Sequence, residues 1–413
     1  MLDGDQTELD VNLVRAHFPA FASHELKGQA FFENAGGSYA CRFVTDRLAR
    51  FYRVRKVQPY GPYPASVVAG AEMDEARRRI SAMLGVAEDE LSFGPSTSQN
   101  TYVLSQAFRR LLQPGDAIVV TDQDHEANSG VWRRLAEDGI EVREWRMDPE
   151  TGHLDPAALA ALLDERVRLV CFPHCSNIVG EINPVRQIAD MAHDVGAHVC
   201  VDGVSYAPHG FPDVSELGAD IYLFSAYKTY GPHQGIMVVR RALAEVLPAQ
   251  CHWFNAADPV KRFTPAGPDH AQVAAAAGIA EYVDTVYAQH VETEAEPVDR
   301  ARVVAGLMRR RETALLEPLL AWLRDRPGIR LLGPTEAAGR APTVAVELDE
   351  PGEAAAARLA GHGIMCAGGD FYAVRTLKGL GVDPSKGVLR LSFVHYTHER
   401  EIERLVEALD REI

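Results

Sequence analysis

Short, continuously apolar stretches alternate with amphipathic stretches through the middle of the chain. Four apolar stretches have the length of buried strands: residues 116–122, 168–174, 197–203 and 220–225. Helical patterns at 129–138 and 183–196 lie between them. Apolar strands separated by amphipathic helices are typical of a parallel sheet covered on both faces. The pattern therefore predicts an α/β fold for this part of the chain.

The pattern changes near residue 270. Helices rich in Ala, Glu and Arg are predicted at 271–289 and 294–325, a strand at 342–348, and a last helix at 397–413. A length of 413 residues is enough for two domains. We therefore predict a large domain over residues 26–270 and a smaller α+β domain over 271–413. Residues 1–25 are expected to pack against the smaller domain.

Charge and cysteine usage narrow the possible partners and the location. A net charge of −16 argues against nucleic acid and against an anionic membrane surface as partners. We find no run of about 18 apolar residues, and the N-terminal MLDGDQTELDVNLV is not a secretory signal. None of the six cysteines is paired in a CxxC motif. We therefore predict a cytoplasmic protein with reduced thiols, without a membrane span and without a metal site.

Polar residues follow the four predicted strands. Because the carboxyl ends of parallel strands form the ligand-binding edge of such sheets, these residues are the first candidates for chemistry. They are Asp124, His125, Asn177, Asp202, Ser205, Ser225, Tyr227 and Lys228. Ahead of them, Gly94-Pro95-Ser96-Thr97 precedes a helical pattern, as an anion site at a helix N-terminus requires.

These residue types match the parts that pyridoxal 5'-phosphate (PLP) chemistry needs. A lysine amine holds the aldehyde as an imine and later moves protons at the substrate Cα, and a carboxylate keeps the pyridine nitrogen protonated. A flat side chain covers the ring, and hydroxyls with backbone N–H groups hold the phosphate. Lys228, Asp202, His125 and the 94–97 turn are the candidates. Each alone is more often a surface charge, a cap or a turn residue, so the prediction depends on their order and shared placement.

Five motifs resemble those of the class V aminotransferases, which are fold-type I PLP enzymes, and of their cysteine desulfurase-like branch. The motifs are FFENAGGS (31–38), DHEAN (124–128), SNIVGEINPV (176–185), VDGVSYAPHG (201–210) and LFSAYKTYGPHQG (223–235). The resemblance covers nearly the whole chain. It implies a large domain with a mostly parallel seven-stranded sheet, a smaller C-terminal domain, and a homodimer with active sites at the subunit interface.

The resemblance also implies a role for each candidate around PLP. Lys228 would form the Schiff base, Asp202 would face the pyridinium, and His125 would stack on the ring. The remaining cofactor contacts would come from Asn177, Ser205, Ser225, Tyr227, Ser96 and Thr97. Towards an amino-acid substrate, Asn34 lies in the opening motif, and Arg390 matches the arginine that grips an α-carboxylate.

The chain departs from the desulfurase pattern at several of these positions. Ser205 and Tyr227 replace a glutamine and a histidine. The phosphate segment that the partner subunit supplies, Gly-Thr-Pro in the family, reads Ala266-Gly267-Pro268 here, so Gly267 replaces the hydroxyl residue. Tyr372 stands where desulfurases carry the cysteine that forms a persulfide. Cys366 lies six residues earlier in a strand-like run, where a buried apolar role is expected. We therefore expect a desulfurase-like subgroup without the usual catalytic cysteine.

Several functions stay open on these residues. A C–S lyase acting by β-elimination needs Lys228 and Asp202 and no cysteine. An aminotransferase uses the same pair with a second, keto-acid half-reaction. An amino-acid epimerase would need a proton donor on the opposite ring face, for which Tyr372 is a candidate. Desulfurase chemistry through Cys366 and a non-catalytic PLP-binding protein are the remaining possibilities.

Overall fold

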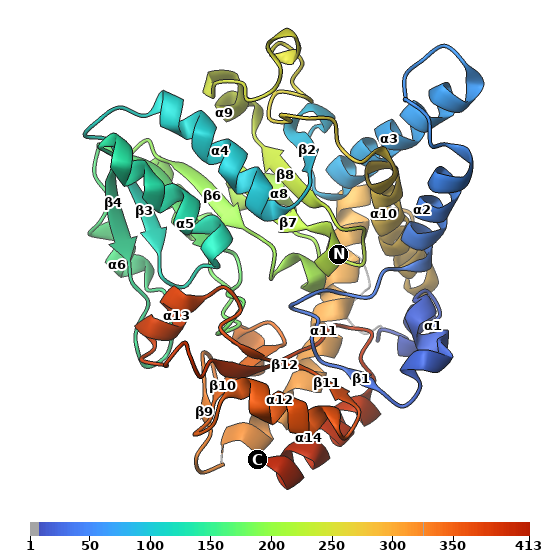
Figure 1. Cartoon of the computed structure of the whole chain (residues 1–413), viewed down its shortest axis with the longest axis vertical. Helices are drawn as coiled ribbons and strands as arrows, with labels where there is room; N and C mark the ends of the chain where they lie inside the picture. Colours follow the sequence, from blue (N-terminus) through green and yellow to red (C-terminus); the bar gives the residue numbers. More distant parts are fainter. Residues whose placement is uncertain (1–7, 325) are drawn as a thin grey trace.

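Seven strands form one sheet in the computed structural model, which describes residues 8–324 and 326–413 (Figure 1). Their order across the sheet is β2 (Leu91–Gly94), β8 (Gly235–Val239), β7 (Ile221–Ser225), β6 (His198–Asp202), β5 (Val167–Pro173), β3 (Ala117–Thr121) and β4 (Glu141–Trp145). β8 is antiparallel to both neighbours, and the other pairs are parallel. The predicted α/β fold with a mostly parallel seven-stranded sheet is confirmed, and β3, β5, β6 and β7 are the four predicted strands.

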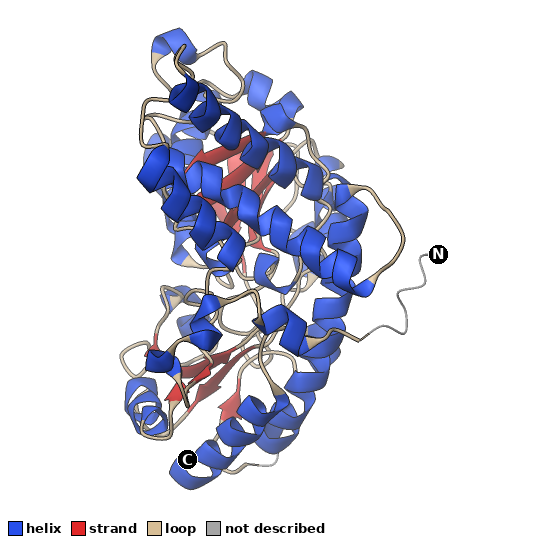
Figure 2. Cartoon of the chain, turned by 90° about the vertical axis from the view of Figure 1, so that its right-hand side faces the viewer, coloured by secondary structure: helices blue, strands red, loops and turns tan. Residues whose placement is uncertain are grey.

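The inner strands are largely apolar because helices cover both faces of this sheet (Figure 2). Successive side chains of a strand point to opposite faces. Val170 and Val201 accordingly lie in one hydrophobic cluster, whereas Leu169 and Cys200 lie in another. The first cluster includes residues of α3 (Pro64–Met83), α7 (Val185–His193) and α10 (His270–His290). The second includes residues of α4 (Thr97–Leu111), α5 (Gly130–Arg133) and α9 (Arg241–Val246).

A smaller unit with a third hydrophobic cluster contains the C-terminal strands. Its antiparallel sheet has the order β12 (Ala367–Gly369), β13 (Val388–Ser392), β10 (Thr343–Glu347) and β9 (Arg330–Leu331). Helices α12 (Gly352–Ala360) and α14 (Glu399–Glu412) pack on it. The early strand β1 (Ala30–Phe31) pairs in parallel with β11 (Ile364–Met365). The opening motif of the chain therefore lies beside the C-terminal unit.

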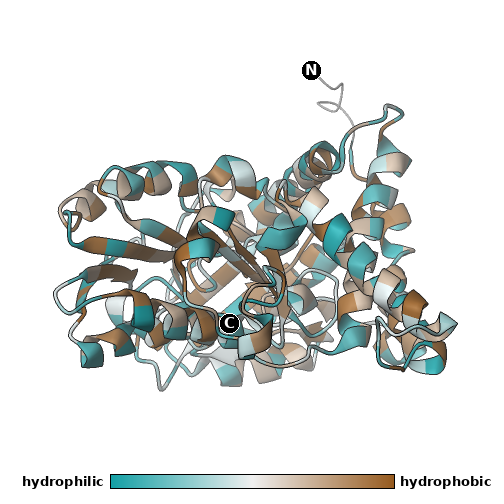
Figure 3. Ribbon diagram, turned by 90° about the horizontal axis from the view of Figure 1, so that it is seen from above, coloured by the Kyte–Doolittle hydropathy of each residue, from teal (hydrophilic) through white to brown (hydrophobic). Residues whose placement is uncertain are grey.

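The remaining helices connect these parts. They are α1 (Val11–Arg15), α2 (Arg42–Val54), α6 (Pro156–Ala160), α8 (Val214–Leu217), α11 (Pro297–Arg324) and α13 (Val374–Gly379). Figure 3 shows brown strands inside the molecule and mixed brown and teal helices around them, as amphipathic helices require. Within the described part of the chain, no helix has the combined length and apolar character needed to cross a bilayer.

Helix α11 crosses from one hydrophobic core to the other. Val304 and Leu307 lie in the cluster of the large sheet, whereas Leu316 and Leu320 lie in that of the C-terminal sheet. Helix α10 packs against α2 and α3 on the large sheet, so it lies in the large unit even though it follows residue 270. We therefore propose a boundary within α11 in place of the expected one at residue 270.

The N-terminal segment contacts both units. Arg15 pairs with Glu401 of α14 at 2.8 Å, which places α1 against the C-terminal unit. The backbone N–H of Asp10 also donates to His290 Nε2 at the end of α10. The expected packing of residues 1–25 falls partly on residues 1–7, which lie outside the described residues, and it stays a prediction.

Trp132 of α5 gives a test of how the core supports the sheet edge. It is fully buried against Phe108, and its Nε1 donates to Asn128 Oδ1 at 3.0 Å. We expect Trp132→Ala to lower the free energy of unfolding by about 3–5 kcal/mol through lost packing. Trp132→Phe keeps much of the ring but loses the hydrogen bond, which costs about 1–3 kcal/mol. Urea denaturation measures both, and equal losses would contradict this account.

Candidate active site

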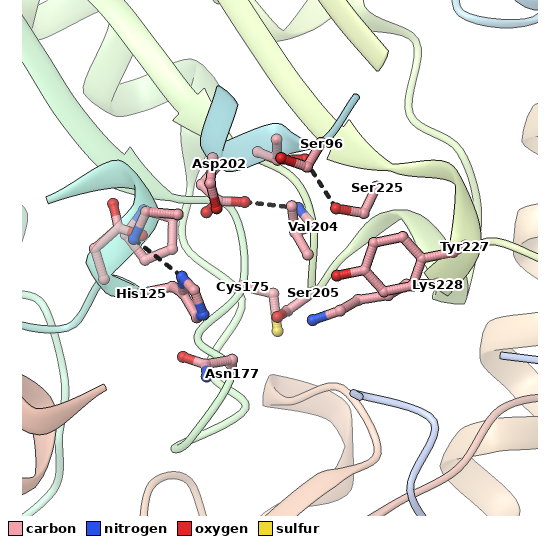
Figure 4. Close-up of a pocket in the computed structure, with 15 residues that line it drawn as sticks. Ser96, His125, Cys175, Asn177, Asp202, Val204, Ser205, Ser225, Tyr227 and Lys228 are labelled. Carbon is pink, nitrogen blue, oxygen red and sulfur yellow. Dashed lines mark hydrogen bonds between the residues drawn. The ribbon is translucent and has the colours of Figure 1, made fainter. Parts of the chain in front are cut away.

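A pocket lies at the carboxyl ends of β5, β6 and β7, beside the N-terminus of α4 (Figure 4). The residues that line it are Ser96, Thr97, Ser98, Asp124, His125, Ala127, Pro173, Cys175, Asn177, Asp202, Val204, Ser205, Ser225, Tyr227 and Lys228. The structure thus brings together all of the predicted cofactor-binding residues.

The topology explains this convergence. Asp202 is the last residue of β6, and Lys228 ends the short 3-10 turn that follows β7. Asn177 lies in the turn after β5. Because these three strands are parallel neighbours, segments far apart in sequence end at the same edge of the sheet.

Lys228 is a buried amine without a hydrogen-bond partner among the described residues. Burial lowers its pKa from 10.5 to about 8, and the positive charge of Arg390 acts in the same direction. The negative charges of Asp202 and Glu33 oppose this shift. A larger fraction of the amine is therefore unprotonated near neutral pH, as a nucleophile or base requires.

Two buried carboxyl groups lie on the opposite side of the pocket. Burial raises the pKa of Asp202 to about 6. Two groups oppose this shift: the backbone N–H of Val204, which donates to Asp202 Oδ1 at 2.8 Å, and the positive charge of Lys228. Burial and the charge of Asp202 raise the pKa of Asp124 well above its usual range. Asn128 donates to Asp124 at 2.7 Å, while the other Asp124 oxygen is buried without a partner among the described residues.

His125 presents a neutral aromatic ring to the pocket. Burial lowers its pKa to about 3, and the positive charges of Lys228 and Arg390 add to this effect. The backbone N–H of Ala127 donates to His125 Nδ1 at 3.0 Å. The neutral ring therefore carries its proton on Nε2, since Nδ1 acts as the acceptor. The ring can stack on a flat ligand and still donate one hydrogen bond.

The start of α4 supplies an anion site. Ser96 caps this helix by accepting from the N–H of Gln99, and Thr97 Oγ1 lies 2.8 Å from Ser225 Oγ. A helix N-terminus with free N–H groups and neighbouring hydroxyls favours phosphate. The turn passes close to Gly235 of β8, where a Cβ atom would lie 2.4 Å from the carbonyl carbon of Ser96. Only glycine lets strand and turn approach this closely.

The remaining predicted residues differ in their distance from this pocket. Tyr227 lines it and stacks on His233, with the ring centroids 4.5 Å apart. Asn34 lies in an adjoining small cavity, shared with Lys228, where its Oδ1 accepts from Tyr396. Tyr372 is 74% exposed, with its ring centroid 5.7 Å from that of His125. Arg390 is buried and pairs with Glu33 at 2.8 Å.

A family model described as "Aminotransferase class-V" matches residues 30–296 and 300–405. The chain belongs to the class-V aminotransferase family. The resemblance in the motifs is therefore confirmed over nearly the whole length of the chain.

Among curated relatives of this chain, the "Aminotransferase-like protein FGM3" of Gibberella zeae is 32% identical over 416 residues, covering 98% of both chains. A cysteine desulfurase of Pectobacterium carotovorum is 30% identical over 424 residues, covering 97% of both. Its solved neighbours include the apo cysteine desulfurase of Thermococcus onnurineus, with a TM-score of 0.84 and 23% identity, covering 100% of this chain and 99% of that one. The cysteine desulfurase CsdA of Escherichia coli has a TM-score of 0.82 and 22% identity, with 98% coverage of both. The two solved structures support the fold.

The sequence pattern missed several residues of this class-V site. Ser98 and Cys175 line the pocket, although the sequence assigned them no role. Asp124 was a strand-end candidate without an assigned role, and the charge of Asp202 acts on its carboxyl group. Glu33 and Phe371 both contact Arg390. Asp124 and Glu33 lie inside quoted motifs, which was the available signal. Phe371 had no signal beyond its neighbour Tyr372.

The residues present fit PLP, the cofactor that the resemblance implies. The pocket offers a buried primary amine, a carboxyl group, a neutral ring and a helix N-terminus. The buried oxygen of Asn177, its Oδ1, has no partner within the described residues, and it is free to accept from a ligand. This donor set matches the amine, pyridine and phosphate contacts of that cofactor.

The pKa of Lys228 gives a direct test that needs no cofactor. Acylation of cofactor-free protein by a small amine-directed reagent should increase through a midpoint near pH 8 at Lys228, because the unprotonated amine reacts. Asp202→Asn removes a negative charge that raises this pKa, so the midpoint should move to lower pH. Peptide mass spectrometry measures both. A wild-type midpoint near 10.5, or an upward shift in the variant, would contradict the described electrostatics.

Proposed function

We propose that the chain is a PLP-dependent enzyme that breaks a C–S bond of an amino-acid-type substrate by β-elimination. The observation that carries this proposal is the convergence of Lys228, Asp202 and His125 at one pocket with the Thr97–Ser225 anion site. When bound, the cofactor supplies an electron sink for the substrate Cα. In this proposal Lys228 anchors the cofactor and Asp202 faces its pyridine nitrogen. His125 covers the ring, and the start of α4 holds the phosphate.

Elimination asks little more of the protein than these residues. The unprotonated amine of Lys228 takes the proton from the substrate Cα. The Cβ–S bond then breaks with its electron pair on sulfur, which takes up a proton and leaves as a thiol. The released enamine takes a proton at Cβ to become an imine, and water hydrolyses this imine to ammonia and a 2-keto compound, so no protein thiol and no second substrate is needed.

The cysteines near the pocket argue against desulfurase chemistry. Cys366 lies between β11 and β12, packed against the C-terminal core, and burial raises its pKa to about 12. Cys175 lines the pocket, but burial also raises its pKa to about 12. A desulfurase needs a thiolate that reaches the substrate sulfur. Tyr372, at the position of the desulfurase cysteine, carries a phenol that cannot form a persulfide.

An aminotransferase is the second candidate. The 32% identity to the "Aminotransferase-like protein FGM3" favours it. The same Lys228 and Asp202 serve both reactions, since both begin with removal of the Cα proton. The two reactions diverge after this step, because a transaminase returns the amino group to a second keto compound.

We also propose a homodimer. The segment Ala266-Gly267-Pro268 lines a second cavity at the surface, together with Tyr60 and Lys261. None of the described residues that line this cavity also lines the main pocket. Two large apolar side chains on the same loop, Trp253 and Phe254, are 87% and 66% exposed. Exposed aromatic side chains of this size are typical of surfaces that bind another protein.

The roles of Lys228 and Asp202 can be separated. Lys228→Ala should abolish the visible absorbance of the lysine-bound cofactor in the purified protein. Asp202→Asn should retain bound cofactor but reduce turnover by roughly 100-fold or more, because the electron sink loses its charge partner. Absorbance spectra and steady-state kinetics measure these effects. A wild-type protein without PLP would contradict the proposal.

Products decide between the reactions. With a panel of S-substituted cysteines and of their amides and esters, elimination predicts a thiol, ammonia and a 2-keto compound in equal amounts. A pyridoxamine form of the cofactor would indicate transamination, and solvent deuterium at Cα without turnover would indicate epimerisation. Either result would contradict elimination.

Cys366 gives a matched test of the thiol. We expect Cys366→Ser to change kcat/KM by less than about twofold, because a half-buried thiol whose pKa is raised to about 12 stays protonated and takes no part in elimination. Cys251→Ser, away from the pocket-lining residues, is the control substitution. A persulfide on Cys366, or a large loss confined to this variant, would restore the desulfurase hypothesis.

A further inference from the structure

Arg390 of β13 is held by three groups of the protein itself. Its Nη2 donates to Glu33 Oε1 at 2.8 Å, and its Nη1 donates to the Asn177 carbonyl at 3.3 Å. Its guanidinium carbon lies 3.7 Å from the centre of the Phe371 ring. The side chain is only 3% exposed. The protein itself therefore holds one N–H of each terminal nitrogen and one face of the guanidinium, while Nε is buried without a hydrogen-bond partner in the described part of the chain.

The local backbone holds Glu33 in this position. Glu33 follows β1 and forms a parallel bridge to Ser392, two residues from Arg390. A Cβ atom on Gly36 would lie 2.5 Å from Glu33 Oε1, so a glycine here leaves room for the carboxylate. The second carboxylate oxygen, Oε2, is buried without a hydrogen-bond partner in the described part of the molecule. The Glu33 carboxylate is thus committed to Arg390.

The turn at 370–372 places the Phe371 ring against one face of the Arg390 guanidinium. Phe371 and Tyr372 have φ values of 51° and 55°, a left-handed conformation that is costly for residues with side chains. Asn177 Nδ2 donates to the Phe371 carbonyl at 3.1 Å, and the Glu126 N–H donates to the Tyr372 carbonyl at 2.9 Å. These bonds keep the Phe371 ring on the guanidinium.

A free α-carboxylate would have to share one guanidinium with the carboxylate of Glu33. Bringing two like charges together in a buried place is unfavourable, since neither can be fully paired. An uncharged carboxyl derivative carries no such penalty. It still offers a carbonyl oxygen as a hydrogen-bond acceptor.

We propose that Glu33 is a specificity-determining residue that selects amino compounds whose α-carboxyl is uncharged, such as amides, esters or thioesters, over free amino acids. The inference rests on the proposed function, because it assumes that the amino compound reacts at Lys228. Glu33 takes the place that a substrate carboxylate would otherwise fill at Arg390.

Small probes that cannot react with Lys228 test this selection. We choose 3,3,3-trifluoropropionate and its amide, whose binding to the full chain as purified can be measured by fluorine NMR line broadening. Glu33→Gln should tighten trifluoropropionate binding by about tenfold or more, because the competing charge is removed. Trifluoropropionamide binding should change by less than about twofold. Glu33→Gln/Arg390→Gln should lose the gain, and Glu350→Gln, which removes an exposed carboxylate paired with Arg358, is the control.

An alternative role for Glu33 predicts the opposite sign. If Glu33 only orients Arg390 for an incoming carboxylate, Glu33→Gln will weaken trifluoropropionate binding or leave it unchanged, and the proposal fails. Thermal unfolding of each variant identifies a loss of fold. The titration needs no cofactor, so a chain that binds no PLP would overturn the proposed function while this measurement still decides the role of Glu33.

Discussion

Lys228 and Asp202 bring opposite charges to the same buried edge of the large sheet, and each affects the titration of the other. Burial lowers the pKa of the lysine to about 8 and raises that of the aspartate to about 6, while their mutual attraction opposes both shifts. The result is an amine that can lose its proton near neutral pH beside a carboxylate that can still hold a charge. The positions of His125, the α4 helix start and Arg390 have chemical meaning because they surround this pair.

The similarity to cysteine desulfurases covers the fold but does not establish the same reaction. The fold is shared with the solved desulfurases, and one fold can host several different reactions. The reaction depends on what the surrounding loops supply. Here the 366–372 segment provides a half-buried thiol, whose pKa burial raises to about 12, and an aromatic turn over Arg390, in place of a reactive thiolate. That difference underlies the proposed elimination and the proposed selection for uncharged carboxyl derivatives.

The strand ends were predictable from sequence because strand periodicity and parallel topology together fix which residues meet. The placement of Asp202 and Lys228 was predicted from the rule that the carboxyl ends of parallel strands lie at the same edge of a sheet. Their roles came from the resemblance of the motifs. The placement of α10 on the large sheet was not predictable from its Ala-rich pattern, which suits either unit. The Glu33–Arg390 pair joins residues 357 positions apart, because Glu33 forms an isolated bridge to the strand that carries Arg390, and no local pattern encodes this pair. The left-handed turn at Phe371 likewise depends on acceptor carbonyls that meet Asn177 and Glu126 only in the folded chain.

Chemical reduction can show whether the cofactor is attached to Lys228. Borohydride treatment of the purified protein fixes an imine as a stable secondary amine, which peptide mass spectrometry can locate. We expect a phosphopyridoxyl group on the peptide that contains Lys228. A modification on a different lysine, or no modification in protein that has been supplied with PLP, would contradict it.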